Sequence, residues 1–415
     1  MIRTHNRPSP LPLLFTLYFC QGLPFGFQAT ALPVLLRQQG FSLAAIGGAG
    51  LLSLPWALKL LWAPFLDRYR LPFAGRRTGW IFLLQGLLIL TALFAWQASM
   101  QESPWPLFAA LFLMNLACAT QDIAVDALTV ASLSKGQLGY GNAAQVGGFK
   151  CGMVMGGGVL MWAASHLGWP FLFGAFPLLL ALPLPLLLLF REPESGDPTK
   201  KADTVKTIIR SGVSLIAKKE LRPLILFVLF YKTGEAMTDV MFKPLLVDRG
   251  FSTATIGLWV GSVGMAASIA GTLAGGFFVK QLGLHRALTL TLSFRLIPLG
   301  AMAGFVHTGG GELALATLTF FEHLAGGMLT TVCFSSMMAV VNKRLGATHY
   351  TALATLEVIG KSPSVWLAGP LAQSLGYLPL FVLGATLSAA VMLLLPRLKP
   401  IFSDPALTQG PKESP

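Results

Sequence analysis

Long apolar segments alternate with short polar ones along almost the whole chain of 415 residues. An apolar segment of about 20 residues is long enough to cross the hydrocarbon core of a bilayer as a helix. The short alternating strands of a membrane barrel would give a different pattern. The chain is therefore predicted to be an all-α membrane protein with twelve transmembrane helices, at residues 11–36, 44–65, 80–98, 106–132, 143–165, 171–190, 223–246, 254–279, 287–306, 312–341, 351–373 and 376–396.

The polar segment 191–222 is the only long connection between predicted helices, and it divides them six and six. The two sets also repeat: LLRQQGFSLAAIG at 35–47 matches LLVDRGFSTATIG at 245–257, 210 residues later. A shared loop after the first helix of each set predicts two six-helix pseudo-repeats in the same orientation. The predicted domains are an N-terminal half at 1–190, a cytoplasmic linker at 191–222, a C-terminal half at 223–397 and a cytoplasmic tail at 398–415.

Composition agrees with a membrane protein, since 54% of residues are hydrophobic and only 11% are charged. The net charge of +13 could indicate nucleic-acid binding in a soluble protein. Here 22 of the 30 Lys and Arg residues fall on the side of the membrane that holds both termini, and two fall in the opposite loops. Such asymmetry predicts that both termini are cytoplasmic, and it makes the charge a topology signal. The four scattered cysteines are interpreted as small core residues, and neither a metal site nor a cofactor is predicted.

Several motifs resemble one transporter family. FLDRYRLPFAGRRTGW at 65–80 is similar to the loop between the second and third helices of major facilitator proteins. QGLPFGF at 21–27, LPWALKLLWAPFLDRY at 54–69 and ATQDIAVDAL at 119–128 resemble a narrower branch. That branch contains AmpG-type muropeptide permeases, acetyl-CoA transporters and the single-protein siderophore permeases of the rhizobactin and pyochelin type. The resemblance implies the major facilitator fold and secondary active transport in a bacterial cytoplasmic membrane.

The compact length and the sequence of the first two predicted helices resemble the siderophore permeases more, so the main prediction is proton-linked import of an iron–siderophore complex by alternating access. Import of cell-wall muropeptides is the alternative. A membrane-embedded acyl or lipid transferase is a third possibility, but the six histidines are dispersed and no clustered nucleophile is present, so the chain is not predicted to be an enzyme. The expected partners are a small-molecule substrate, protons and the lipid bilayer, with no nucleic acid, and the chain is expected to be a monomer.

Charged residues within the predicted helices are the candidate functional groups. Each would cost about 2.5–3.5 kcal/mol at the bilayer centre, so they are expected to face the protein interior. Lys232, Glu235, Asp239 and Lys243 lie within about 80° of one face of a helix. This stripe could neutralise itself and seal the two halves, or it could bind a polar substrate or a proton.

Other helices carry further candidates. Gly148, Gly152 and Gly156 predict a close-packed seam, which directs Lys150 to the opposite side of its helix. Arg295 has no acidic neighbour in sequence, and Glu322 is one candidate partner; Glu322 and His323 could also transfer protons. The predicted substrate or proton pathway consists of Gln21, Gln28, Asp122, Lys150, Lys232, Glu235, Asp239, Arg295, Glu322, Glu357 and Lys361.

Asp122 and Asp126 are expected to have different roles, although they lie one turn apart. Asp126 is nearer the predicted cytoplasmic end of its helix and the basic loop that follows the second helix. A conformational latch is therefore predicted from Asp67, Arg68, Arg76, Arg77 and Asp126, whereas Asp122 is expected to face the substrate.

Overall fold

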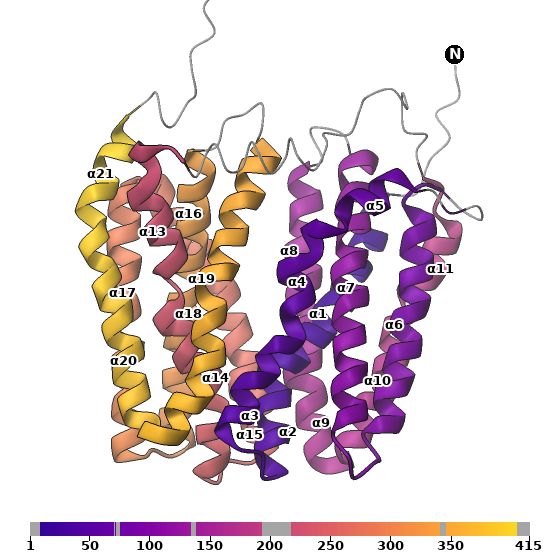
Figure 1. Ribbon diagram of the computed structural model, residues 1–415, viewed down its shortest axis with the longest axis horizontal. Coiled ribbons are helices and arrows are strands. Elements are labelled where there is room, and N and C mark those ends of the chain that lie inside the picture. The colour runs from indigo at the N-terminus through magenta and orange to yellow at the C-terminus, as the bar shows by residue number, and fades with distance from the viewer. Residues whose placement is uncertain are drawn as a thin grey trace, which may run out of the picture. The chain divides into compact units, whose positions relative to one another are not determined.

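The computed structural model describes residues 9–69, 71, 75–133, 138–192, 217–340 and 346–404. All regular structure within these ranges is helical (Figure 1). Nine of the described helices are long and apolar enough to cross a membrane. Three further helical segments, 43–68, 222–248 and 346–375, are shorter, broken or more polar, and with them the twelve predicted passes are accounted for. The predicted all-α architecture is confirmed.

The helices group into two compact units. The N-unit is drawn from residues 1–32 and 52–202, and the C-unit from residues 33–51 and 203–415. The helices of the N-unit are α1 (Leu11–Gly26), η1 (Phe27–Ala31), α4 (Leu54–Leu58), η3 (Lys59–Leu61), α5 (Ala63–Arg68), α6 (Thr78–Ala98), α7 (Trp105–Ser132), α8 (Leu138–Val154), η5 (Met155–Val159), α9 (Leu160–Leu167), α10 (Trp169–Leu180) and α11 (Pro183–Leu189). Those of the C-unit are α3 (Leu43–Gly48), η6 (Lys219–Leu221), α13 (Arg222–Phe230), α14 (Thr233–Asp248), α15 (Thr253–Ile256), η7 (Gly257–Val263), α16 (Gly264–Leu282), α17 (Leu284–Thr308), α18 (Glu312–Ala339), α19 (Gly346–Leu375), α20 (Tyr377–Ala390), η9 (Val391–Leu394) and α21 (Leu395–Ser403). Two helices span a unit boundary: α2 (Leu32–Gln38), which enters the C-unit at Pro33, and η2 (Ala49–Ser53), which leaves it after Leu51.

The segment Pro33–Leu51 groups with the C-unit although the sequence places it in the N-terminal half. The reason is local packing: Gly47 lies against the backbone of Gly369 on α19. The backbone N–H of Ala44 also donates to the side chain of Gln373, 3.2 Å away. The helical pass 11–38 is therefore shared between the two units, and the change of unit follows the π-helical turn η1.

Glycines bring α1 and α8 into close contact within the N-unit. A Cβ atom on Gly148, Gly152 or Gly156 would collide with a carbonyl oxygen of α1, at Phe15, Phe19 or Leu23 respectively. The predicted seam is confirmed, and α1 is the helix that packs against it. Small residues allow such close backbone approach between membrane helices.

The seventh pass departs from the single straight helix that the sequence predicts. Helix α13 ends at Phe230, two turn residues follow, and α14 begins at Thr233. The break places Lys232 at the N-cap of α14. The four charged residues of this pass therefore do not form one continuous helical stripe.

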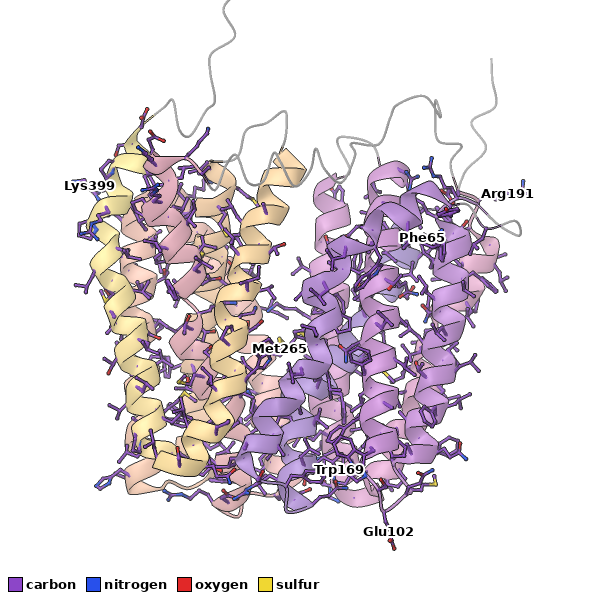
Figure 2. The ribbon with its side chains drawn as sticks, viewed as in Figure 1. Phe65, Glu102, Trp169, Arg191, Met265 and Lys399 are labelled. Atoms are coloured by element: carbon purple, nitrogen blue, oxygen red, sulfur yellow. The ribbon has the colours of Figure 1, made fainter. Side chains whose placement is uncertain are left out.

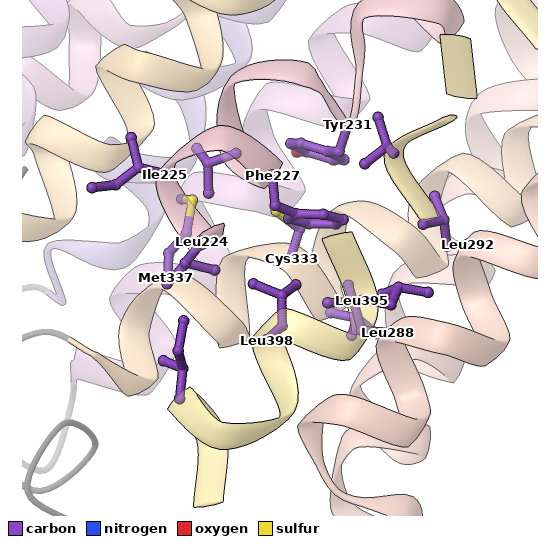
Figure 3. Close-up of a cluster of buried hydrophobic side chains, with 14 of the residues drawn as sticks. Leu224, Ile225, Phe227, Tyr231, Leu288, Leu292, Cys333, Met337, Leu395 and Leu398 are labelled. Carbon is purple, nitrogen blue, oxygen red and sulfur yellow. The ribbon is translucent and has the colours of Figure 1, made fainter. Parts of the chain in front are cut away.

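A hydrophobic core occupies one end of the C-unit, between α13, α17, α18 and α21 (Figure 3). The rings of Phe227 and Tyr231 stack there with centroids 5.5 Å apart, and Cys333 is fully buried beside them. Cys20 and Cys118 are also buried, as predicted. The prediction is wrong for Cys151, which is exposed on the outer face of α8.

Loops at opposite ends of the N-unit follow the predicted alternation of sides. Figure 2 shows Glu102, in the connection between α6 and α7, at one end of the unit and Arg191, which follows α11, at the other. Each helical pass between these positions thus returns the chain to the other end, as a bundle of membrane-crossing helices requires.

Candidate functional site

Asp122 is buried in the N-unit and forms an ion pair with Lys59, which is partly exposed. Lys59 comes from η3, in the broken second pass, and its ammonium also lies over the ring of Trp56, 5.4 Å from the centroid. The sequence predicted Asp122 as a site residue but left Lys59 out of the site. The missed signal is the short 3₁₀ break at 59–61, which turns a lysine of the second pass toward α7.

Asp126 lies one turn after Asp122 on α7, and its hydrogen-bond donors are uncharged. Its Oδ1 accepts hydrogen bonds from the hydroxyl of Tyr18 at 2.6 Å and from the amide of Gln145 at 3.1 Å. These donors come from α1 and α8, so the carboxylate joins three helices of the N-unit. The two aspartates therefore have different partners, a lysine for one and uncharged groups for the other.

The basic loop proposed for the latch is only partly described. The side chains of Asp67 and Arg68 lie outside the described residues. Glu192 accepts hydrogen bonds from the backbone N–H groups of Arg77 and Thr78, each at 3.0 Å, and its other oxygen lies 3.6 Å from the Arg77 guanidinium. A carboxylate at this position stabilises the N-terminus of α6. Arg76 is exposed in the turn before that helix.

The remaining predicted positions of the N-unit differ in their surroundings. Gln28 accepts a hydrogen bond of 2.7 Å from Asn115, whose own carbonyl accepts one from Trp56 at 3.0 Å. Gln21 is fully buried, and neither atom of its amide has a hydrogen-bond partner. Lys150 is half-buried on α8.

Two lysines share one carboxylate in the C-unit. The Oε1 atom of Glu357 lies 3.0 Å from the Nζ atom of Lys361, one turn along α19, and 3.5 Å from that of Lys232. The carboxylate is nearly buried, with 5% of its side chain exposed, whereas 32% of the Lys361 side chain is exposed. This three-residue group, here called the lysine cluster, carries one excess positive charge.

Arg295 lies between two carboxylates. Its Nη2 atom is 2.5 Å from Oε1 of Glu322, and its Nε atom is 3.3 Å from Oε2 of Glu235. The guanidinium also donates to the backbone carbonyl of Glu322. The pairing with Glu322 agrees with the candidate partner from sequence, and Glu235 on α14 is an additional one. Glu235 is the looser of the two, since its Oε2 atom lacks a hydrogen bond.

His323 completes this group from the position next to Glu322. Its Nδ1 atom lies 2.5 Å from Oε2 of Glu322 and 3.1 Å from the carbonyl oxygen of Thr319. Both neighbours are acceptors, so Nδ1 carries the hydrogen, and Nε2 is the nitrogen that can take up a further proton. We call Arg295, Glu235, Glu322 and His323 the arginine cluster; with neutral histidine it carries one excess negative charge.

Asp239 pairs with Lys243 one turn along α14. The Asp239 side chain is 42% exposed while that of Lys243 is 3% exposed, so the pair presents its carboxylate outward. The predicted stripe on this pass is therefore divided among three groups. Lys232 joins the lysine cluster, Glu235 joins the arginine cluster, and Asp239 and Lys243 bind each other.

The C-unit thus holds two ionic groups, one with two lysines around one carboxylate and one with two carboxylates around one arginine. A group with two lysines can bind an anion, and a carboxylate that has an ion-pair contact but no hydrogen bond at one oxygen can accept a proton there. Within the described ranges, we find no group of three or more His, Cys, Asp or Glu side chains that could hold a metal ion.

Comparison with known proteins assigns the chain to a family. The model of the major facilitator superfamily matches residues 14–361. The chain belongs to this superfamily. It is 30% identical over 407 residues to the anhydromuropeptide permease of Escherichia coli, a match that covers 95% of this chain and 81% of the relative. A protein of Rickettsia felis described as putative transporter AmpG 4 is 23% identical, and the match covers 92% of this chain and 94% of the relative.

Solved structures confirm the fold at lower identity. The nucleoside transporter NupG superposes with a TM-score of 0.71 at 13% identity, covering 94% of this chain and 99% of that one. A bacterial homologue of the human lysosomal transporter Spinster gives a TM-score of 0.68 at 17% identity, covering 99% and 100%. The family and these relatives are transporters. Of the two substrates predicted from sequence, the relatives support the muropeptide, and the siderophore prediction gains no support from them.

Proposed function

We propose that this protein imports anhydromuropeptides across the bacterial cytoplasmic membrane, by alternating access and coupled to protons. The observation that carries the proposal is the match to the E. coli anhydromuropeptide permease, which extends over 95% of the chain. Both units take part in that match, so the relationship is not confined to one bundle.

The lysine cluster supports an anionic substrate. Muropeptides carry a peptide with free carboxylates, and two ammonium groups around one glutamate leave one positive charge for such a group. Lys361 is the more exposed of the two lysines, so it is the one we assign to the incoming carboxylate. Glu357 holds the lysines together when no substrate is bound.

The arginine cluster supports proton coupling. Glu322 is fixed by Arg295 and His323, each at 2.5 Å, whereas Glu235 has a longer contact with Arg295 and an oxygen without a hydrogen bond. A proton added to Glu235 leaves the Arg295–Glu322 pair intact. We therefore assign the transported proton to Glu235, with His323 as a second acceptor.

Uptake by cells tests the substrate. The chain is expressed in an E. coli strain that lacks its own anhydromuropeptide permease, and uptake of radiolabelled anhydromuropeptide is measured beside an iron-loaded siderophore. Accumulation of the muropeptide above the level of the empty vector, without accumulation of the siderophore, is the expected result. Siderophore uptake alone would overturn the proposed substrate.

Purified protein in vesicles tests the coupling separately. Vesicles that are acidic outside should accumulate labelled anhydromuropeptide above equilibrium, and a proton ionophore should abolish the accumulation. Transport that only equilibrates the label under both conditions would contradict proton coupling while leaving the substrate assignment in place.

A further inference from the structure

An apolar groove runs along the outside of the C-unit between α17 and α18. Its volume is about 870 Å³. The walls are exposed apolar side chains, with Ile297 66% exposed on α17 and Leu313 81% and Phe321 45% exposed on α18. Large apolar side chains exposed in this way on membrane-crossing helices face lipid. The groove therefore opens to the acyl chains of the bilayer.

Small residues on α17 create the groove. Ala301 and Gly304 lie on its lining, and a Cβ atom on Gly304 would meet open space. The hydroxyl groups of Thr308 and Thr317, which also line it, donate to carbonyls of their own helices at 3.0 and 2.9 Å. The groove consequently offers an apolar surface with no free donor from these two threonines.

The groove is long enough to hold an acyl chain. The lining on α17 runs from Phe294 to Thr308, which is about 21 Å along a helix. One leaflet of the hydrocarbon core is about 15 Å deep. The groove is therefore longer than one leaflet is deep, and an acyl chain can lie in it while the headgroup stays at the membrane surface.

A positive charge lies at the surface end of the groove. The Arg249 guanidinium donates to the carbonyl of Val306 and lies against Gly309, a lining residue, where a Cβ atom would come within 3.0 Å of Nη1. Within the described ranges Arg249 has no carboxylate at ion-pair distance; Asp248, its neighbour, is paired with Arg37. Glu312, between the lining residues Gly311 and Leu313, accepts a hydrogen bond from Trp259 at 2.8 Å; like Arg249, neither Glu312 nor Trp259 is itself a lining residue.

We propose that this groove is a binding site for an anionic phospholipid, with one acyl chain between α17 and α18 and the phosphate at Arg249. The shape selects a chain, and the guanidinium selects a negatively charged headgroup. No residue of the lysine or arginine cluster lines the groove, and the inference does not depend on the transported substrate.

Native mass spectrometry of the full chain tests the headgroup. Detergent-solubilised protein is titrated with palmitoyl-oleoyl phosphatidylglycerol or with the phosphatidylcholine of the same chains. Phosphatidylglycerol should bind more tightly, and Arg249→Gln should reduce that preference about fivefold, the effect of one basic residue at a lipid surface. Arg397→Gln, which removes an exposed arginine on α21, should leave it unchanged. Equal binding of the two lipids by the native chain would overturn the proposal.

A second pair of variants tests the groove. Gly304→Phe should fill it and abolish the tightly bound lipid, whereas Gly276→Phe, at another exposed glycine with open space around it, should not. Phosphatidylglycerol with a diazirine on its acyl chain should label peptides of α17 and α18 in the native chain. Labelling confined to other helices, or undiminished binding by a folded Gly304→Phe protein, would overturn the site.

Discussion

Arg37 and Asp248 form a bidentate ion pair at one end of the C-unit, with Nε–Oδ1 and Nη2–Oδ2 distances of 2.6 and 2.8 Å. The hydroxyl of Tyr377 donates to the same Oδ2 atom at 2.7 Å. Arg37 belongs to the segment Pro33–Leu51, which continues from a helix of the N-unit. The pair therefore fastens that segment to α14 and α20 within the C-unit.

Exchanging the charges of Arg37 and Asp248 should preserve the attraction between the two positions. Arg37→Gln and Asp248→Asn should each destabilise the C-unit by up to about 1 kcal/mol, the upper range for a partly exposed pair. The double variant Arg37→Asp with Asp248→Arg should recover part of the loss because the attraction is restored. Thermal unfolding of the native chain, of the single variants Arg37→Asp and Asp248→Arg, and of their double variant measures this coupling. Independent, additive effects would show that the pair does not act as a unit.

Lys361 should control substrate affinity. Lys361→Met removes the excess positive charge of the lysine cluster, because Lys232 and Glu357 then balance each other. A lost charge-assisted hydrogen bond is worth roughly 1.5–3 kcal/mol, so KM for muropeptide uptake should rise about 10- to 100-fold. Lys361→Arg should keep most of the affinity. Lys399→Met, at an exposed lysine of α21, is the control and should have a native KM.

How far the sequence predicts this arrangement differs from residue to residue. The Gly148–Gly156 seam and the Glu357–Lys361 contact follow from helical spacing alone, because both depend on neighbouring turns. The partner of Asp122 does not, since Lys59 reaches it only through a local 3₁₀ break. The charged stripe of the seventh pass fails for the same reason: the turn at Tyr231 and Lys232 ends the regular helix. Lys232 and Glu235 then pair with residues of other helices, whereas Asp239 and Lys243 keep the one-turn contact that helical spacing predicts.

The substrate was harder to predict than the fold. Apolar length and the repeat at 35–47 and 245–257 determine a twelve-helix, two-part chain, because the bilayer restricts what can cross it. Chain length favoured a siderophore, but length carries no chemical information about the site. The lysine cluster does, and it forms only because the fold brings Lys232 to the pair Glu357 and Lys361, which lies more than a hundred residues later in the sequence.

Gly152 should tolerate no side chain. Gly152→Ala directs a Cβ atom at the carbonyl oxygen of Phe19, so α1 and α8 must separate, and such overpacking is expected to destabilise the N-unit by about 1–3 kcal/mol. Gly147→Ala on the same helix meets only the movable ring of Phe15 at 3.7 Å and should be close to neutral. Thermal unfolding of the two variants compares them. Equal stability would contradict the close approach of the two helices.

Glu322 should matter more for folding than Glu235. Glu322→Gln leaves a buried guanidinium without its nearest carboxylate and His323 without its partner, and breaking a buried pair typically costs about 3–5 kcal/mol. Glu235→Gln removes only the longer contact, so it should lower stability far less. Unfolding monitored in detergent distinguishes the two. Equal losses would mean that Arg295 depends on both carboxylates alike.

Glu235→Gln should uncouple muropeptide transport from the proton gradient. A glutamine cannot take up or release a proton, yet it keeps the shape of the side chain, and the Arg295–Glu322 pair remains. The variant should still exchange labelled for unlabelled muropeptide across vesicles, and it should no longer accumulate the label when the outside is acidic. Glu102→Gln, in the exposed connection between α6 and α7, serves as the control and should accumulate normally. Full accumulation by Glu235→Gln would exclude Glu235 as the proton carrier and leave His323 as the next residue to test, because its Nε2 atom is the remaining acceptor in the arginine cluster.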